Sequence, residues 1–271
     1  MRPPAKRQRK RMATVAAVYT VAPYARNPES VMSQEAHASP RPKVHNKRLW
    51  ASVEREADAI IEDLFQEALW RDPTQQRAWV VLVDGEPHQL ARIHAAAARH
   101  QVTVTIVMDF IHVLAYLWDA AHSFYPGDSA KAEAWVEERT LKVLQGQARA
   151  VAAGMRRSAT LRGISDKPRE AVDTCADYLL NRPSYLRYDV FLAQGFPIAT
   201  GVIEGACRHL VKDRMDLTGA RWRLKSAEAV LQLRSLRSSG DFEAYWRFHK
   251  QQELQRNHVS RYAEPLFLDA A

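Results

Sequence analysis

The sequence has few cysteines and no long apolar run. Only Cys175 and Cys207 occur among 271 residues, too few and too far apart for a disulfide framework or a cysteine zinc site. No apolar run approaches the roughly 20 residues that span a bilayer. No apolar signal-peptide segment follows the basic N-terminus. With 46% hydrophobic and 26% charged residues, these absences predict a soluble protein of the reduced cytoplasm.

Acidic residues are outnumbered, and the imbalance is local. There are 39 basic and 31 acidic residues, a net charge of +8. This balance excludes an acidic, disordered solubilising protein and favours a polyanionic partner. Residues 1–12 contain six basic residues and no acid, so the rest of the chain carries only +2. This stretch is interpreted as a solvated tail, an arm that binds phosphates, or part of a linker.

The first half of the chain alternates strand and helix patterns. Apolar, β-branched runs predict strands, and apolar residues at helical spacing predict helices. The expected strands are 12–22, 48–53, 79–83 and 102–108, and the expected helices are 54–70, 87–100 and 110–121. Over residues 79–121 the order strand–helix–strand–helix predicts parallel pairing, with helices on the faces of the sheet.

The second half reads as helical. Residues 126–197 contain no convincing strand and predict an inserted helical subdomain. A further helix is expected to open near Ile198, to carry Glu204 and to break at Gly219. Another helix is expected over 227–238, and 250–271 looks like a polar tail.

Three carboxylates form the candidate chemical site. Asp84 and Asp109 follow expected strands directly, at the edge where open α/β sheets form their sites. Glu204 lies on a helix after the large insertion. Carboxylates gathered from separate elements suit Mg²⁺ or Mn²⁺, and two such ions can act on a phosphodiester. The alternative is that these acids are ordinary loop and helix residues.

Basic residues follow Glu204. On a regular helix Arg208 and Lys212 would share its face, which suits a metal at one end and nucleic-acid phosphates along the other. An ordinary Glu–Arg helix pair is the alternative. The basic side chains expected to bind DNA are Arg208, Lys212, Arg214, Arg221 and Arg223, with Lys225 in the same cluster and Arg234 and Arg237 further along.

Two further side chains allow more than one interpretation. His112, one helical turn after Asp109, either supports a metal ligand or contacts DNA, or it is a packed structural histidine. Trp222, between two arginines, is either a core residue or a platform on which an unpaired base stacks.

Four strings carry a resemblance to a known family. They are V-L-V-D-G (81–85), D-F-I-H-V-L-A-Y-L-W (109–118), A-A-G-M-R-R-S-A-T-L-R-G (152–163) and G-V-I-E-G-A-C-R-H-L-V-K-D-R-M-D-L-T-G-A-R-W (201–222). The chain resembles the ISKra-type insertion-sequence transposases of bacteria, which are similar to the Mutator-like branch of the DDE transposases. The resemblance runs from about Met12 to Tyr262.

The resemblance implies a fold, an activity and roles for residues. It implies an α/β, ribonuclease-H-like core with a helical insertion, and metal-dependent DNA cleavage and strand transfer with Mg²⁺ or Mn²⁺. Glu204 matches the catalytic glutamate and Asp84 the second catalytic aspartate. Asp109 and His112 match a following [C/D]-x-x-H element, and Asp109 stays open as a metal ligand. The implied partners are the terminal repeats and target DNA, a second copy, or an upstream-encoded part.

The sequence departs from the family in its first catalytic aspartate. That residue belongs to a D-G-x-G-V-P-like string on a first strand, and no such string is present. The segment 12–22 matches the second strand instead, and the basic run before it resembles a linker. We therefore expect a C-terminal portion, either truncated or encoded in one of two frames. Alone, it is expected to be inactive and marginally stable, because its central strand and one ligand are missing.

The expected organisation has five parts. These are a basic tail or linker remnant (1–11), the first part of the core (12–125), the helical insertion (126–197), the remainder of the core with the Glu204 helix (198–240), and a C-terminal helix or tail (241–271). Two other functions stay open. One is a catalytically dead fragment that binds DNA or an intact transposase as a regulator, and the other is an unrelated α/β domain with a helical cap.

Overall fold

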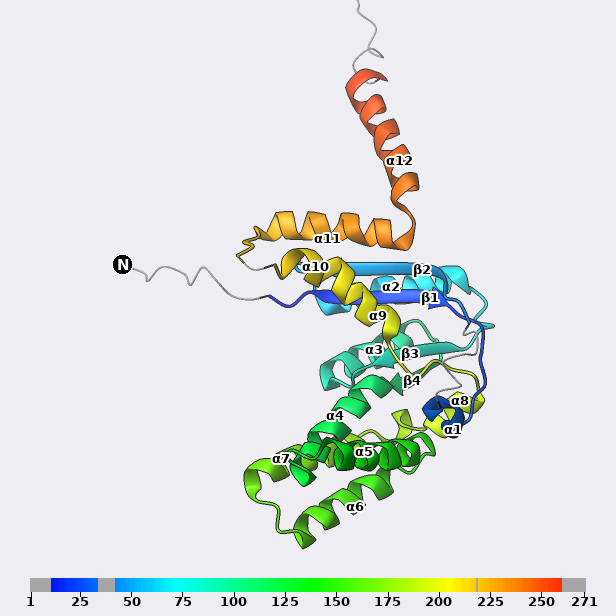
Figure 1. Cartoon of the computed structure of the whole chain (residues 1–271). Helices are drawn as coiled ribbons and strands as arrows, with labels where there is room; N and C mark the ends of the chain where they lie inside the picture. The colour runs from blue at the N-terminus through cyan, green and yellow to red at the C-terminus, as the bar shows by residue number, and fades with distance from the viewer. Residues whose placement is uncertain (1–10, 34–41, 218, 260–271) are drawn as a thin grey trace, which may run out of the picture. The chain divides into compact units, whose positions relative to one another are not determined.

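The computed structural model describes residues 11–33, 42–217 and 219–259. The protein is a mixed α/β chain in which helices predominate (Figure 1). It divides into two compact units. Unit one comprises Met1–Thr20, His45–Glu56 and Gly205–Ala271, and unit two comprises Val21–Val44 and Ala57–Glu204. The predicted basic tail falls almost wholly on residues 1–10, outside the described residues.

Unit one is built on an antiparallel strand pair. Strands β1 (Thr14–Thr20) and β2 (His45–Ser52) pair with Thr14 opposite Ser52, and the register shifts near the end of β1. Helix α11 (Leu224–Ser239) packs along β2 (Figure 1). The Oγ of Ser239 accepts a hydrogen bond from the backbone N–H of Leu49 at 2.9 Å. The buried apolar residues of this unit include Ala16, Leu49, Ala51, Ala227 and Leu231.

A buried carboxylate closes the end of β2. Glu228 on α11 is 6% exposed and accepts hydrogen bonds from the Oγ of Ser52 and the N–H groups of Val53 and Glu54. Burial raises the pKa of Glu228, but these hydrogen bonds and one from Gln232 outweigh burial and hold the pKa below its usual value. Glu228 thereby satisfies backbone donors that would otherwise be left without acceptors where the strand ends.

Unit two contains a parallel strand pair. Strands β3 (Trp79–Val83) and β4 (Val104–Met108) pair in parallel with Val83 opposite Met108, as the sequence pattern predicted. Three helices follow the expected order: α2 (Ala57–Arg71), α3 (Pro87–Arg99) and α4 (Phe110–Phe124). Ile61, Ile93, Val107 and Leu117 lie in one hydrophobic core formed by these elements. A short helix, α1 (Pro28–Met32), completes the first part of the unit.

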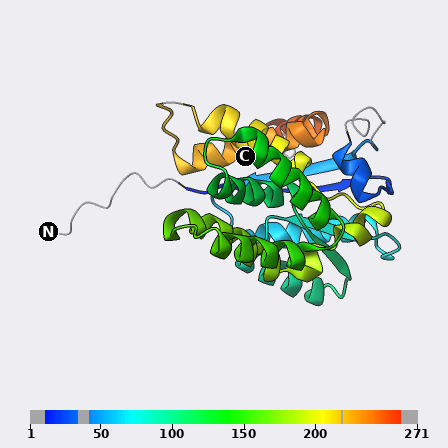
Figure 2. The same ribbon diagram turned by 60° about the horizontal axis from the view of Figure 1, so that its bottom comes forward.

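The stretch from 126 to 197 is helical and contains no strand. It forms α5 (Ser129–Leu144), α6 (Ala148–Leu161), α7 (Asp166–Leu180), the 3₁₀ turn η2 (Pro183–Tyr185) and α8 (Tyr188–Ala193). Helices α4, α5, α6 and α7 pack side by side (Figures 1 and 2). Their buried side chains, such as Met155 and Leu179, belong to the same hydrophobic core as β3 and β4. The helices of this stretch and the parallel strands therefore pack as one body.

The Glu204 helix begins later and is less regular than expected. It runs as α9 (Gly201–Ala206), a π-helical turn η3 (Cys207–Lys212) and α10 (Asp213–Met215). The division between the two units falls within α9, after Glu204. The shared face of Glu204, Arg208 and Lys212 was predicted on a regular α-helix, and the π-helical turn replaces that helix. Backbone hydrogen bonds in a π-helix join residues i and i+5, so the i, i+4 spacing of an α-helix does not apply there.

The expected polar tail starts as a helix. Helix α12 (Phe242–Leu254) continues into a π-helical turn, η4 (Gln255–Val259), and residues 260–271 lie outside the described residues. No residue of α12 is buried. No helix in the described part of the chain is long and apolar enough to cross a membrane.

Candidate nucleic-acid processing site

The two aspartates lie where the parallel strands end. Asp84 follows β3 and Asp109 follows β4, and the N–H of Asp109 donates to the carbonyl oxygen of Val83 at 2.7 Å. The structure thus places both aspartates at the carboxyl edge of one strand pair, as the sequence predicted. Both charges affect Tyr178 on α7. Burial is the main cause that raises the pKa of Tyr178, and the charges of Asp84 and Asp109 raise it further.

Asp84 is exposed and little used by the fold. Its carboxylate accepts one hydrogen bond, from the N–H of Glu86 at 3.2 Å. Its carbonyl oxygen accepts a hydrogen bond from the hydroxyl of Tyr178 at 2.8 Å. The backbone of Asp84 is therefore held in place while its carboxylate stays available to a ligand.

Gly85 explains the D-G dipeptide physically. Its φ of +93° lies in the left-handed region that favours glycine. A Cβ at this position would lie 2.8 Å from the Sδ of Met108 and 3.1 Å from the Nε of Arg182. The backbone after Asp84 can therefore approach both side chains only because residue 85 has no Cβ.

Asp109 is buried and fully engaged. It is 1% exposed, and its carboxylate accepts hydrogen bonds from the N–H groups of Ile111 and Thr200 at 3.1 and 3.2 Å. The hydroxyl of Thr200 also donates to it, and the Nδ1 of His112 lies 3.1 Å from it. Asp109 therefore caps α4 and fastens the segment before Glu204, which fits a positioning residue better than an open metal ligand.

The segment before Glu204 is anchored at two points. Besides the bonds from Thr200, the carbonyl oxygen of Ile198 accepts a hydrogen bond from the N–H of Phe110 at 2.8 Å. These bonds hold residues 198–200 outside the helix, which begins at Gly201 and not at Ile198. Glu204 lies in the first turn of α9 with an exposed side chain, and its N–H donates to the carbonyl oxygen of Thr200 at 3.0 Å.

His112 is paired with Asp109 on one side of its ring and is not packed in the core. Its Nδ1 pairs with the buried Asp109, while 49% of its side chain is exposed. This carboxylate–histidine arrangement leaves the other ring nitrogen as the polar group it can offer to a ligand. The sequence identified the pair by its spacing, but could not show that Thr200 would join it.

The predicted DNA-binding cations belong to unit one. Arg208, Lys212, Arg214, Arg221 and Arg223 are all exposed. Arg208 lies 3.9 Å from the carboxylate of Asp213. The guanidinium of Arg214 lies 5.6 Å from the ring centroid of Trp222, which is half-buried. These cations lie on η3, α10 and the segment that leads into α11.

Helix α11 fixes the π-helical turn of this basic surface. The guanidinium of Arg234 donates to the carbonyl oxygen of His209, with Nε at 2.9 Å. π-Helical turns are frequent at functional sites. The sequence offered no signal for this turn, because no glycine or proline interrupts 206–215.

The donor set for a metal ion is incomplete in the residues described. They contain no group of three or more His, Cys, Asp or Glu side chains that could hold a metal ion. Both carboxylate oxygens of Asp109 accept hydrogen bonds within the fold. Asp84 and Glu204 are therefore the exposed carboxylates of the predicted triad. These two do not suffice for the two-metal site that the resemblance implies.

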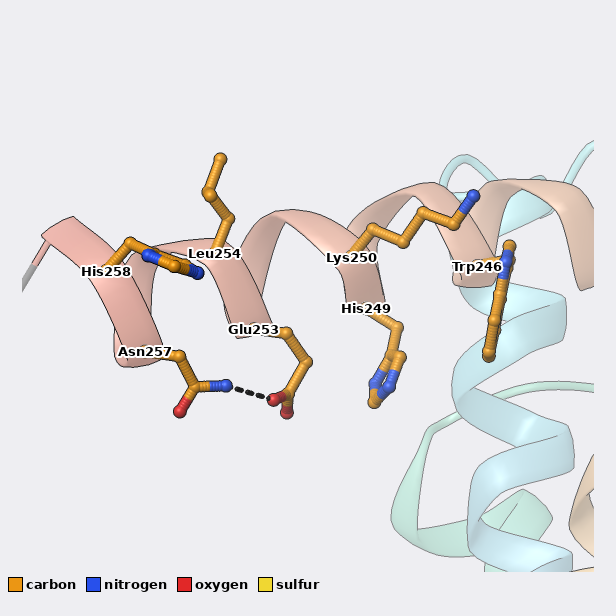
Figure 3. A pocket seen from close by; sticks show the side chains of 7 residues that line it. All are labelled: Trp246, His249, Lys250, Glu253, Leu254, Asn257 and His258. Carbon is orange, nitrogen blue, oxygen red and sulfur yellow. Dashed lines mark hydrogen bonds between the residues drawn. The ribbon is translucent and has the colours of Figure 1, made fainter.

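A hollow in unit one is lined by none of the predicted site residues. It follows one side of α12 and η4, where Trp246, His249, Lys250, Glu253, Leu254, Asn257 and His258 line it (Figure 3). The Nδ2 of Asn257 donates to Glu253 at 2.7 Å. All seven side chains come from this one helical segment, so the hollow is a shallow surface feature.

Comparisons with protein-family models, with curated proteins and with solved structures find no match for this chain.

Proposed function

We propose that this chain is the C-terminal catalytic portion of a DDE-type transposase, which cleaves DNA and transfers strands at the ends of an insertion sequence. The observation that carries the proposal is the edge formed by β3 and β4. It presents the exposed Asp84 beside the buried Asp109, and Asp109 fastens the segment that leads to Glu204. Separate elements that present carboxylates near one sheet edge suit divalent cations and phosphodiester chemistry.

The proposed roles differ among the three carboxylates. Asp84 and Glu204 are the metal ligands, since both are exposed and little engaged. Asp109 positions the Glu204 segment and orients His112. A further carboxylate, from a segment outside this sequence, completes the Mg²⁺ or Mn²⁺ site. The chain alone is therefore proposed to be inactive in cleavage and strand transfer.

DNA is the proposed partner, together with a second copy or an upstream-encoded part. Arg208, Lys212, Arg214, Arg221 and Arg223 are proposed to bind its phosphates, because all five are exposed and cations that neutralise phosphates release counterions. The proposed place of action is the bacterial nucleoid.

A regulatory fragment is the second candidate. The incomplete donor set in the described residues favours this candidate, because a chain without a complete metal site would bind without cutting. Such a chain, bound to DNA or to an intact transposase, would compete with the active protein. The two candidates differ in whether supply of the missing carboxylate restores cleavage.

Manganese binding tests the assignment of ligands. Electron paramagnetic resonance of Mn²⁺ added to the purified chain should show weak binding that Asp84→Asn and Glu204→Gln each abolish. Glu133→Gln, an exposed glutamate on α5, is the matched control and should bind as the wild type does. Binding that survives both substitutions would contradict the assignment and favour an unrelated α/β domain.

A further inference from the structure

Arg182 lies beside Asp84 although it belongs to the helical stretch. It follows α7, in a short loop that is held at two points. The N–H of Tyr185 donates to the carbonyl oxygen of Arg182 at 3.1 Å, and the hydroxyl of Tyr185 lies 2.8 Å from the Nε2 of His94 on α3. The loop is therefore fixed against the part of the unit that contains β3.

The guanidinium of Arg182 is directed toward the end of β3. It lies 5.3 Å from the ring centroid of Tyr178, whose hydroxyl binds the carbonyl oxygen of Asp84. Its Nε would lie 3.1 Å from a Cβ at position 85. The absence of a side chain at Gly85 thus permits the close approach of this cation to the backbone at Gly85, next to Asp84.

The donors of Arg182 have no acceptor in the described part of the chain. No ion pair or side-chain hydrogen bond of its guanidinium occurs there. By contrast, Arg156 on α6 pairs with Asp173 at 3.2 Å and Asp177 at 2.7 Å. A half-buried guanidinium carries five N–H donors in a planar fork, and the ligand that best matches this fork is a phosphate or a carboxylate.

We propose that Arg182 binds a DNA phosphate at the end of β3, next to Asp84. This inference rests on the proposed function and adds a residue of the helical stretch to those proposed to contact DNA. A cation here offsets the repulsion between the Asp84 carboxylate and a phosphodiester. The face of Tyr178 holds the guanidinium in place, which lowers the entropy that ordering it would cost.

The salt dependence of DNA binding tests this proposal. Each phosphate contact contributes about −0.9 to the slope of log K against log salt. Arg182→Met keeps the aliphatic packing on Tyr178 and removes the charge. With a 20-base-pair duplex of arbitrary sequence, it should reduce the magnitude of the slope by about one and weaken binding roughly eightfold at about 0.1 M salt. Arg149→Met, at an exposed arginine on α6, is the control and should reduce the magnitude of the slope less or not at all.

A measurement on the wild-type chain covers the case in which Arg182→Met fails to fold. Phenylglyoxal modifies accessible arginines, and peptide mass spectrometry locates the labels. The duplex should protect Arg182 and leave Arg149 labelled. Equal labelling of Arg182 with and without bound duplex, or an unchanged salt slope in Arg182→Met, would overturn the role of Arg182.

The outcomes separate this proposal from the proposed function. If the duplex binds without protecting Arg182, Arg182 is excluded and the transposase proposal stands. If Arg182 is protected but the metal-binding test on Asp84 and Glu204 fails, Arg182 is a phosphate site of a DNA-binding protein that is not a transposase. If the chain binds no duplex, both proposals fail.

Discussion

At the scale of single residues, the two aspartates of the β3–β4 edge differ in burial and in hydrogen bonding. Asp84 is exposed and accepts one hydrogen bond, while Asp109 is buried and accepts bonds from the backbone and side chain of Thr200. Sequence spacing alone treats these residues alike, because each follows an apolar strand. Burial distinguishes them, and for this reason the ligand role is proposed for Asp84.

Substitution of each aspartate should change the free energy of unfolding to a different extent. Asp109→Asn removes the acceptor of the Thr200 hydroxyl and places an amide in a buried site, so it should lower the free energy of unfolding by about 1–3 kcal/mol. Asp84→Asn should change it by no more than about 0.5 kcal/mol. Urea denaturation followed by circular dichroism measures both. Equal effects would contradict the assignment.

Gly85 provides a second test at this scale. Gly85→Ala adds a Cβ that meets Met108 and Arg182 in a left-handed backbone conformation, so we expect a loss of about 1–3 kcal/mol. Gly154→Ala is the matched control. Gly154 lies exposed in α6 with open space at its Cβ, so alanine there should stabilise by roughly 0.5–1 kcal/mol. Thermal unfolding measures both, and a neutral Gly85→Ala would refute the steric argument.

At the scale of elements, local signals predicted the strands and helices, and distant contacts moved their ends. The strand at 79–83 matches its prediction because an apolar run meets Asp84-Gly85. Helix α2 begins at Ala57 and not at residue 54, because Glu228, distant in sequence, binds the backbone N–H groups of Val53 and Glu54. Helix α9 begins at Gly201 because Asp109 holds Thr200.

The C-terminal end and the site show the same limit. Residues 242–254 have no glycine or proline to stop a helix, so α12 continues past residue 250, where the polar tail was expected to start. The position of Asp84 and Asp109 at the same edge of the strand pair followed from the strand order. The approach of Arg182 could not be predicted, because it depends on how α7 packs against α4.

The Glu228 contact predicts a pH dependence of stability. Its pKa is lower in the folded chain than the usual 4.5, so its contribution is present above pH 4.5 and is lost as the pH falls through the lower, folded-state pKa. Glu228→Gln should lower stability by about 1–3 kcal/mol at neutral pH and by less in acid. Urea denaturation from about pH 3 to about pH 6 measures this. A constant difference between the two proteins would contradict the linkage.

At the scale of the whole molecule, each sheet in the described residues has only two strands. Isolated two-stranded sheets are marginal, and here helices supply most of the core. Among the residues described, β3 pairs with β4 alone, and its sequence, W-V-V-L-V, contains no charge or proline to protect an edge. An additional strand that pairs with an open edge and carries a carboxylate would complete the proposed enzyme.

DNA cleavage tests the central claim most directly. The assay uses Mn²⁺ and DNA that carries the ends of the mobile element proposed to encode this chain. It compares the chain with a version extended upstream through the proposed first strand. We predict that only the extended protein cuts and that Glu204→Gln abolishes the cut. Cleavage by the unextended chain would contradict the account, because Asp84, Asp109 and Glu204 would then form a complete triad and Asp109 would be a metal ligand.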